Sequence, residues 1–553
     1  MRIRHRLLCG LWAGCLALFG LSSVQAQQQY PTPMLARVAP SGGKVGTTVE
    51  VVLSGAHLEG VTGLHFSNSS LKATLIPPPK PKDPKKPTPP GPPKFNITIP
   101  SNLPTGSYEV RAIGKWGLSN PRIFSVGSLN EINEKENKGD VPQAQDIEMN
   151  VVVNGVIAQN IDIDYFRFSG EKGQRVLIHC AAFSIDSRLT PLLQLDSSKG
   201  KLLATSVRYQ NRDALLDVSL PDSDDYLIRV GEFTHQFGSN DYFYRLTVSQ
   251  KPWVDVAYPP VVQRGKASTV TLYGRSLPGG QVDPAAKIDG QSLEKLSVTI
   301  PPSSAQAKDL NLDDPMMART ASVDGFHYRL KSPLGDSNPV LLTYATSPII
   351  LDNGDNDSIE KAQPIKTPAE LCGRIEKSRD KDRYLFEAKK GDVLILDGFA
   401  DRLGSPMDLY FQIIRMDNKQ LLGEYDEHPT IPSQAGSVFT RTEDPLAKFT
   451  APVDGKYMIV VGSRTGAASF GPRNIYRICI RKEMPDFRLL LVGNTDGSAG
   501  GCTLRRGGHQ DLQVVCMRQD GFEGEVKLVV EGLPAGVTCA PQAIGPKQKD
   551  TSL

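Results

Sequence analysis

The chain has 553 residues, which is too long for a single hydrophobic core and predicts several domains. It carries 63 lysines and arginines against 60 aspartates and glutamates, and three of the arginines lie in the first six residues. A chain that is neutral beyond that point does not favour nucleic acid or an anionic membrane as its main partner. With 50 glycines, 42 prolines and 7% aromatic residues, its composition favours short strands joined by turns.

The N-terminus has the features of a secretory signal. Arg2, Arg4 and Arg6 precede an apolar run from Leu7 to Leu21, and small residues lead to Ala26. This pattern predicts a cleaved signal peptide over residues 1–26 and a protein exported to the periplasm, the cell surface or the medium. No later stretch approaches 18 apolar residues, so no transmembrane segment is expected after cleavage. Six cysteines follow residue 26, and export permits disulfides whose pairing the spacing leaves open.

Residues 31–128 show the alternation of a β-rich module. Val49, Val51 and Leu53 recur at every second position, and Gly55 and Gly60 interrupt the pattern after them. Together with the later Gly-Ser-Tyr-Glu-Val and Leu-Ser-Asn motifs, these residues resemble the IPT/TIG immunoglobulin-like module. Within it, the proline-rich segment 77–94 cannot pair in a sheet and is expected to be an exposed, polyproline-like loop, either a solvated insertion or a docking strip.

An acidic, weakly apolar segment then leads into a second module, residues 129–250. Its first motif is Asp162-Ile-Asp164-Tyr-Phe166-Arg-Phe168, and it ends with Tyr244-Arg-Leu-Thr-Val248. In this order the motifs resemble the bacterial pre-peptidase C-terminal domain. The resemblance implies a β-sandwich of jelly-roll type, found beside secreted proteases and in exported multidomain proteins.

Both modules recur. The stretch Gly46–Gly60 aligns without gaps on Gly265–Gly279, and Asp162–Phe168 returns as Asp380–Phe386. We therefore predict a second Ig-like module over residues 251–349 and a second pre-peptidase-type sandwich over 350–483. Residues 484–553 resemble part of a further Ig-like domain, and we expect the protein to continue beyond them. The predicted fold class is all-β, a series of Ig-like and jelly-roll sandwiches.

Acidic residues near the start of each pre-peptidase-type sandwich are candidate calcium ligands. Calcium takes six to eight oxygen ligands, often carboxylates on a flexible segment, and relatives of this domain can hold it in this region. The second copy offers Asp352, Asp355, Asn356, Asp357, Asp380 and Asp382. The first copy offers a weaker set, Glu134, Glu136, Asp140, Asp162 and Asp164. The alternative is that the aspartates cap turns and that the first core strand begins there.

No nucleophile elbow, zinc-protease motif or phosphate-binding loop occurs in the sequence, so we expect no catalytic activity in this chain. His179 stands beside Cys180, but adjacent strand residues point to opposite faces, which favours a structural role. Tyr242 and Tyr244 share a strand face and are candidate ligand-binding residues, with core packing as the alternative.

These features predict an exported, non-catalytic protein for surface adhesion or for binding an extracellular polymer, glycan or protein. One alternative is an accessory region of a secreted hydrolase or protease whose catalytic domain lies outside this chain. The other is a purely structural protein of the cell envelope. Calcium is the one cofactor that the sequence suggests.

Overall fold

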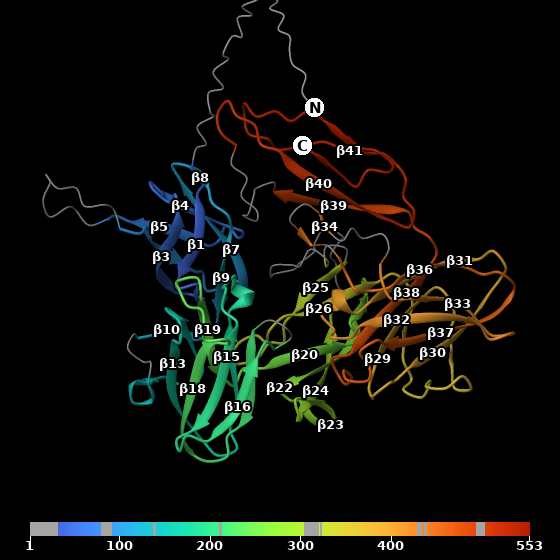
Figure 1. Ribbon diagram of the computed structural model, residues 1–553, viewed down its shortest axis with the longest axis horizontal. Coiled ribbons are helices and arrows are strands. Elements are labelled where there is room, and N and C mark those ends of the chain that lie inside the picture. Colours follow the sequence, from blue (N-terminus) through green and yellow to red (C-terminus); the bar gives the residue numbers. More distant parts are fainter. Residues whose placement is uncertain are drawn as a thin grey trace, which may run out of the picture.

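A computed structural model describes residues 31–78, 91–135, 140–209, 213–302, 320, 323–428, 434–435, 438–439, 441–493 and 504–553. The predicted signal peptide, most of the proline-rich loop, Glu136 and Cys502 lie outside these ranges. The described chain is nearly all β, and its helical turns are short 3-10 segments. Figure 1 shows separate β units along the chain, which confirms the predicted fold class of tandem β-sandwiches. We name the units A to E in chain order.

Unit A packs two sheets face to face around a core that includes Val51, Phe95 and Phe124. The sheet orders are β1-β3-β6-β5 and β2-β9-β7-β4, with β8 paired to β7. Its strands are β1 (Met34–Ala39), β2 (Gly42–Lys44), β3 (Thr48–Ala56), β4 (Gly63–Phe66), β5 (Lys72–Ile76), β6 (Lys94–Thr98), β7 (Gly106–Gly114), β8 (Gly117–Leu118) and β9 (Arg122–Gly127).

Unit B consists of two five-stranded sheets, β10-β12-β19-β14-β17 and β11-β13-β18-β15-β16. Its elements are β10 (Asn130–Asn133), η1 (Val141–Gln143), β11 (Gln145–Asp146), β12 (Val151–Val156), β13 (Ile163–Gly170), β14 (Arg175–Ala181), η2 (Phe183–Ile185), β15 (Pro191–Ser197), β16 (Leu202–Val207), β17 (Ala214–Ser219), β18 (Asp224–Glu232) and β19 (Phe243–Ser249). Asp164, Phe166 and Phe168 alternate inward along β13, as the period of two predicts.

Unit C has the sheets β20-β22-β24-β23 and β21-β26-β25, so its first sheet repeats the strand order of the first sheet of unit A. Its strands are β20 (Trp253–Tyr258), β21 (Val261–Gln263), β22 (Ser268–Arg275), β23 (Gln281–Ile288), β24 (Gln291–Ile300), β25 (Gly325–Tyr328) and β26 (Val340–Ala345).

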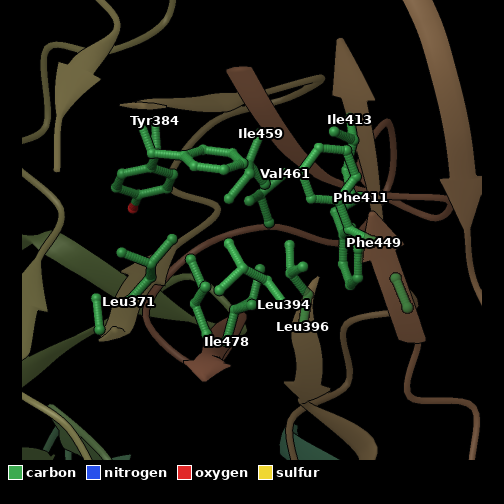
Figure 2. Close-up of a cluster of buried hydrophobic side chains, with 14 of the residues drawn as sticks. Leu371, Tyr384, Leu394, Leu396, Phe411, Ile413, Phe449, Ile459, Val461 and Ile478 are labelled. Carbon is green, nitrogen blue, oxygen red and sulfur yellow. The ribbon is translucent and has the colours of Figure 1, made fainter. Parts of the chain in front are cut away.

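Unit D repeats the topology of unit B, with sheet orders β27-β29-β38-β31-β36 and β28-β30-β37-β32-β33. Its elements are β27 (Ile349–Leu351), β28 (Gln363–Pro364), β29 (Ala369–Arg374), β30 (Asp382–Ala388), β31 (Val393–Phe399), η4 (Asp401–Leu403), β32 (Leu409–Arg415), β33 (Gln420–Tyr425), β36 (Leu446–Thr450), β37 (Gly455–Ser463) and β38 (Ile475–Arg481), with the hairpin β34 (Gln434–Ala435) and β35 (Val438–Phe439). In its core, Leu371, Tyr384 and Phe411 gather with side chains from both sheets (Figure 2).

Unit E has a three-stranded sheet, β39-β40-β43, and a two-stranded one, β41-β42. Its strands are β39 (Asp486–Gly493), β40 (Leu512–Gln519), β41 (Val526–Leu528), β42 (Gln542–Ile544) and β43 (Asp550–Ser552). Cys516 is a buried free thiol in this unit, as Cys180 is in the core of unit B.

Buried charges join units B and C. Arg175 on β14 donates to Asp217 at 2.7 Å and to Glu294 of unit C at 2.6 Å. Arg275 of unit C lies 3.3 Å from Asp217 and 3.4 Å from Asp255, and its side chain is 3% exposed. Since breaking a buried ion pair leaves a desolvated charge, this network favours one fixed angle between the two units.

Candidate functional site

Unit D brings together three of the predicted calcium ligands. One carboxylate oxygen from each of Asp357, Asp380 and Asp382 lies within 4.8 Å of the other two. We call these residues the acidic cluster. Asp382 begins β30, Asp380 precedes it by two residues, and Asp357 comes from the segment between β27 and β28. All three were candidates in the sequence, and the fold brings Asp357 against the two aspartates of the repeated motif.

Asp382 is the most deeply buried member of the acidic cluster, at 2% exposure. Burial, then the neighbouring charge of Asp352, raises its pKa to about 8. Its Oδ2 accepts a hydrogen bond from the Tyr476 hydroxyl at 2.5 Å, and that hydroxyl lies 2.7 Å from the hydroxyl of Tyr384. A carboxyl group held here is costly to ionise unless a cation accompanies it.

Asp352 and Asn356 adjoin the acidic cluster. Burial raises the pKa of Asp352, and the charge of Asp380 contributes. Asn356 is fully buried, and among the described residues neither its amide nitrogen nor its carbonyl oxygen has a well-formed hydrogen bond. The Asn356 amide still lies close enough to Asp352 to lower the pKa of that carboxyl. A buried, unsatisfied amide beside converging carboxylates is unusual, and its oxygen is a hard ligand of the kind that calcium takes.

Two lysines near the acidic cluster form ion pairs with candidate ligands. Lys377 forms an ion pair with Asp357 and lies 3.9 Å from Asp380, and its hydrogen bond lowers the pKa of Asp357. Asp355, predicted as a ligand, instead pairs with Lys361 at 2.5 Å and is exposed. Of the predicted ligands in unit D, Asp352 and Asn356 therefore lie near the acidic cluster, whereas Asp355 is bound elsewhere.

The matching positions of unit B are bonded within the protein. Asp164 accepts a hydrogen bond from the Tyr244 hydroxyl at 2.6 Å, and Glu134 lies 3.2 Å from the same hydroxyl. Asp162 accepts from the Ala158 amide at 2.7 Å, and Asp140 caps η1. Within the described ranges these carboxylates form no cluster of metal-ligand geometry.

Of the two candidate ligand-binding tyrosines, the structure buries Tyr244, as the core-packing alternative predicts. Tyr244 is 1% exposed, and its hydroxyl serves Asp164 in the interior. Tyr242 precedes β19 and is only partly buried. Its ring stacks on Phe237 with centroids 6.3 Å apart and an angle of 9° between the planes, and Phe237 is 52% exposed. The surface aromatic pair is thus Tyr242 with Phe237.

A pocket of about 520 Å³ adjoins Tyr242 at one end of unit B. Phe183, Arg188 and Arg208 line it together with Tyr242. The sequence gives no local signal for this set, because its members come from three connections that lie far apart along the chain. Only the sandwich topology brings them to one end.

A larger cavity of about 1390 Å³ lies where units A to D meet. His179 lines it, packs on Trp253 with ring centroids 4.8 Å apart, and lies 3.5 Å from Asp213. The Ser184 hydroxyl donates to Asp213 at 2.5 Å rather than to the histidine. The ring of His179 therefore packs at the junction between units B and C.

No protein-family model and no curated protein matches this sequence. Solved structures with similar parts include a pre-peptidase C-terminal domain of a Bacillus anthracis collagenase, at 14% identity over 19% of this chain and 93% of that one, with a TM-score of 0.16. A Bacteroides ovatus surface glycan-binding protein in complex with a mixed-linkage heptasaccharide aligns at 10% identity over 37% and 73%, with a TM-score of 0.13. The M60 catalytic domain with two CBM51 domains of Clostridium perfringens ZmpB aligns at 10% identity over 82% and 55%, with a TM-score of 0.13.

These TM-scores are too low for any functional argument to rest on them. In the part of the chain that the structure describes, no helix has the length and apolarity needed to span a membrane.

Proposed function

We propose that this chain is an exported, non-catalytic protein that binds an extracellular polymer. The observation that carries the proposal is the surface aromatic pair, Phe237 and Tyr242, beside the pocket at the end of unit B. Aromatic rings bury a large area on contact at a small cost in conformational entropy, and they suit ligands with flat apolar faces. The fixed angle between units B and C would hold this end of the molecule in one orientation.

The same chain can serve as an accessory region of a larger secreted hydrolase, in which case the pocket would deliver a polymer to a catalytic domain elsewhere. Its recognition chemistry is the same in both settings. A purely structural role in the envelope is the remaining alternative, and it requires no ligand at this pocket.

The experiment is binding of the full chain to an array of extracellular polymers, comparing Phe237→Ala with Phe470→Ala. Phe470 is a matched control because it lies in the corresponding β37–β38 connection of unit D and is 47% exposed, close to the 52% of Phe237. We expect Phe237→Ala to weaken binding and Phe470→Ala to leave it unchanged. A chain that binds no polymer, or two variants that behave alike, would count against the proposal.

We also propose that the acidic cluster of unit D, with Asp352 and Asn356, binds calcium as a structural ion. The raised pKa of Asp382 and the unsatisfied amide of Asn356 support this proposal. A bound cation would allow the buried carboxyls to ionise and would give the Asn356 oxygen a partner. The ion would stabilise the β27–β30 region and take no part in polymer binding at unit B.

A further inference from the structure

The pocket beside Tyr242 combines exposed aromatic and cationic side chains. Phe183, at the start of η2, is 53% exposed. Arg188 lies in the connection that leads from η2 to β15, and Arg208 follows the end of β16. All three line the pocket with Tyr242, so two aromatic residues and two arginines border one space of about 520 Å³.

Arg188 and Arg208 differ from the ion-paired arginines of the same unit. Arg245 pairs with Glu131 at 2.7 Å, and Arg175 pairs with Asp217 at 2.7 Å. Arg188 and Arg208 are exposed, and neither guanidinium has an ion pair or hydrogen bond with another described residue. At one pocket, two guanidinium groups that have no partner within the described ranges are available to an anionic ligand, and each can form a bidentate pair with a carboxylate.

The pocket walls favour a saccharide over a peptide strand. The lining residues come from η2, the connection that follows it, the turn after β16 and the residue before β19, and none of them belongs to a strand that could pair with a peptide. Ring faces suit the apolar C–H faces of a sugar, and guanidinium forks suit its carboxylates. A ligand that carries both is a polysaccharide built of uronic acids.

We propose that this pocket binds an acidic polysaccharide, with uronate carboxylates on Arg188 and Arg208 and sugar rings against Phe183 and Tyr242. The inference rests on the proposed function, since it names the class of polymer for the same end of unit B. No covalent step is involved.

Unit D provides an internal contrast because it has the same strand order and a matching 3-10 turn, η4. There Asp401, Pro406 and Asn474 occupy the positions of Phe183, Arg188 and Tyr242. The acidic-polysaccharide site is therefore a property of unit B, and unit D should not bind this ligand.

The test measures binding of the full chain to polygalacturonate and to a neutral β-glucan at low and moderate salt. The variant Arg188→Ala/Arg208→Ala is compared with Lys199→Ala/Lys201→Ala, which removes two exposed charges from the β15–β16 turn, at the other end of the same hairpin. We expect the arginine variant to lose affinity for polygalacturonate by about tenfold or more. The lysine variant should stay within about twofold of the parent chain, since distant surface charges are screened.

The outcomes separate the two proposals. Binding to polygalacturonate that falls only in the arginine variant supports the acidic polysaccharide. Polyglutamate is measured beside them as an acidic polymer without sugar rings. Equal binding to the neutral glucan, no effect of the arginine variant, or preference for polyglutamate over polygalacturonate overturns the acidic-polysaccharide proposal. If the neutral glucan binds and Phe237→Ala abolishes that binding, the proposed function stands without the acidic class. If no polymer binds, both fall.

Discussion

Units B and D share one topology, yet they treat the same buried carboxyl position differently. In unit B, Glu134 accepts a hydrogen bond from the Val156 amide at 2.9 Å and lies near the Tyr244 hydroxyl. In unit D the matching residue is the shorter Asp352, whose Oδ1 is buried without a partner among the described residues. Side-chain length thus separates a carboxylate with partners for both oxygens from one whose Oδ1 has none among the described residues.

A second substitution between the two units adds to this difference. The inward residue after the second aspartate is Phe166 in unit B and Tyr384 in unit D. In unit D the Tyr476 hydroxyl contacts both Tyr384 and Asp382, whereas in unit B the Tyr244 hydroxyl contacts two carboxylates. The same repeated motif thus has hydrogen-bond partners for its buried carboxylates in unit B, whereas in unit D buried oxygens remain without partners among the described residues. That difference is why calcium is proposed for unit D alone.

The largest expected effect concerns Arg402 of unit D, which occupies the position of Ser184 in unit B. Each of these residues bonds a buried aspartate. In unit D, Arg402 is 2% exposed and bonds Asp444 at 2.7 Å, whereas in unit B Ser184 bonds Asp213. Arg402→Ala should destabilise unit D by about 3–5 kcal/mol, since it leaves a buried charge unpaired. Ser184→Ala should cost unit B about 1 kcal/mol. Hydrogen exchange of the full chain, followed on peptides from each unit, measures the loss of stability in each variant. Equal losses of stability in the two variants would contradict the predicted difference between units B and D.

The second largest expected effect is a difference between units B and D in stabilisation by calcium. At about 100 times its Kd, calcium should add about 2.7 kcal/mol to the stability of unit D and nothing to unit B. Asp382→Asn removes a proposed ligand and should abolish the gain of unit D, while Asp164→Asn, at the matching position of unit B, should leave that gain unchanged. Hydrogen exchange over β30 and β13, compared in calcium and in a chelator, measures this difference. If the protection of β30 is the same in both, the calcium proposal is wrong.

The pH dependence of the metal-free chain gives a smaller but directional difference. Asp382 stays protonated in the folded chain up to about pH 8, whereas its usual pKa is 3.8. The folded state then binds more protons than the unfolded state between these values, so the stability of unit D should fall as pH rises from about 4 to about 8. Neighbouring Asp352 and Asp380, whose pKa values are also raised, act in the same direction, and Asp357, paired with Lys377, acts in the opposite one.

Hydrogen exchange over β30 between pH 5 and pH 8 in chelator, corrected for the intrinsic exchange rate, measures this slope. Asp382→Asn should flatten it and should raise the stability of unit D at pH 8 without calcium. If the stability of unit D in the parent chain rose with pH over this range, the raised pKa of Asp382 would be contradicted.

The smallest expected effect on stability belongs to the surface aromatics. Phe237→Ala and Phe470→Ala should each change the stability of their unit by less than about 0.5 kcal/mol, because both rings are about half exposed. Thermal unfolding of the two variants checks this. A large loss for Phe237→Ala would mean that its ring supports the β18–β19 connection, and its binding defect could then not be assigned to ligand contact.

Much of the fold was predictable because its signals are local. The period-two alternation places Asp164, Phe166 and Phe168 on the inward face of β13, as observed. Two glycines carried a signal that sequence reasoning missed: a Cβ at Gly155 or at Gly373 would stand 2.2 Å from the ring of Tyr244 or the hydroxyl of Tyr476. Each glycine leaves space for the tyrosine whose hydroxyl donates a hydrogen bond to the buried aspartate. The two glycines therefore indicate that a tyrosine side chain lies in the interior of each unit.

By itself, the sequence determined the all-β class, the strand periodicity and the repeat of the Asp-x-Asp motif, because each depends on residues close together along the chain. Only the tertiary structure decided that Tyr244 is buried, that Asp355 pairs with Lys361, and that Asp357 joins Asp380 and Asp382. It also decided that Arg188 and Arg208 border one pocket. These juxtapositions arise from the pairing of strands distant in sequence, and no local pattern of residues encodes which loops meet at one end of a sandwich.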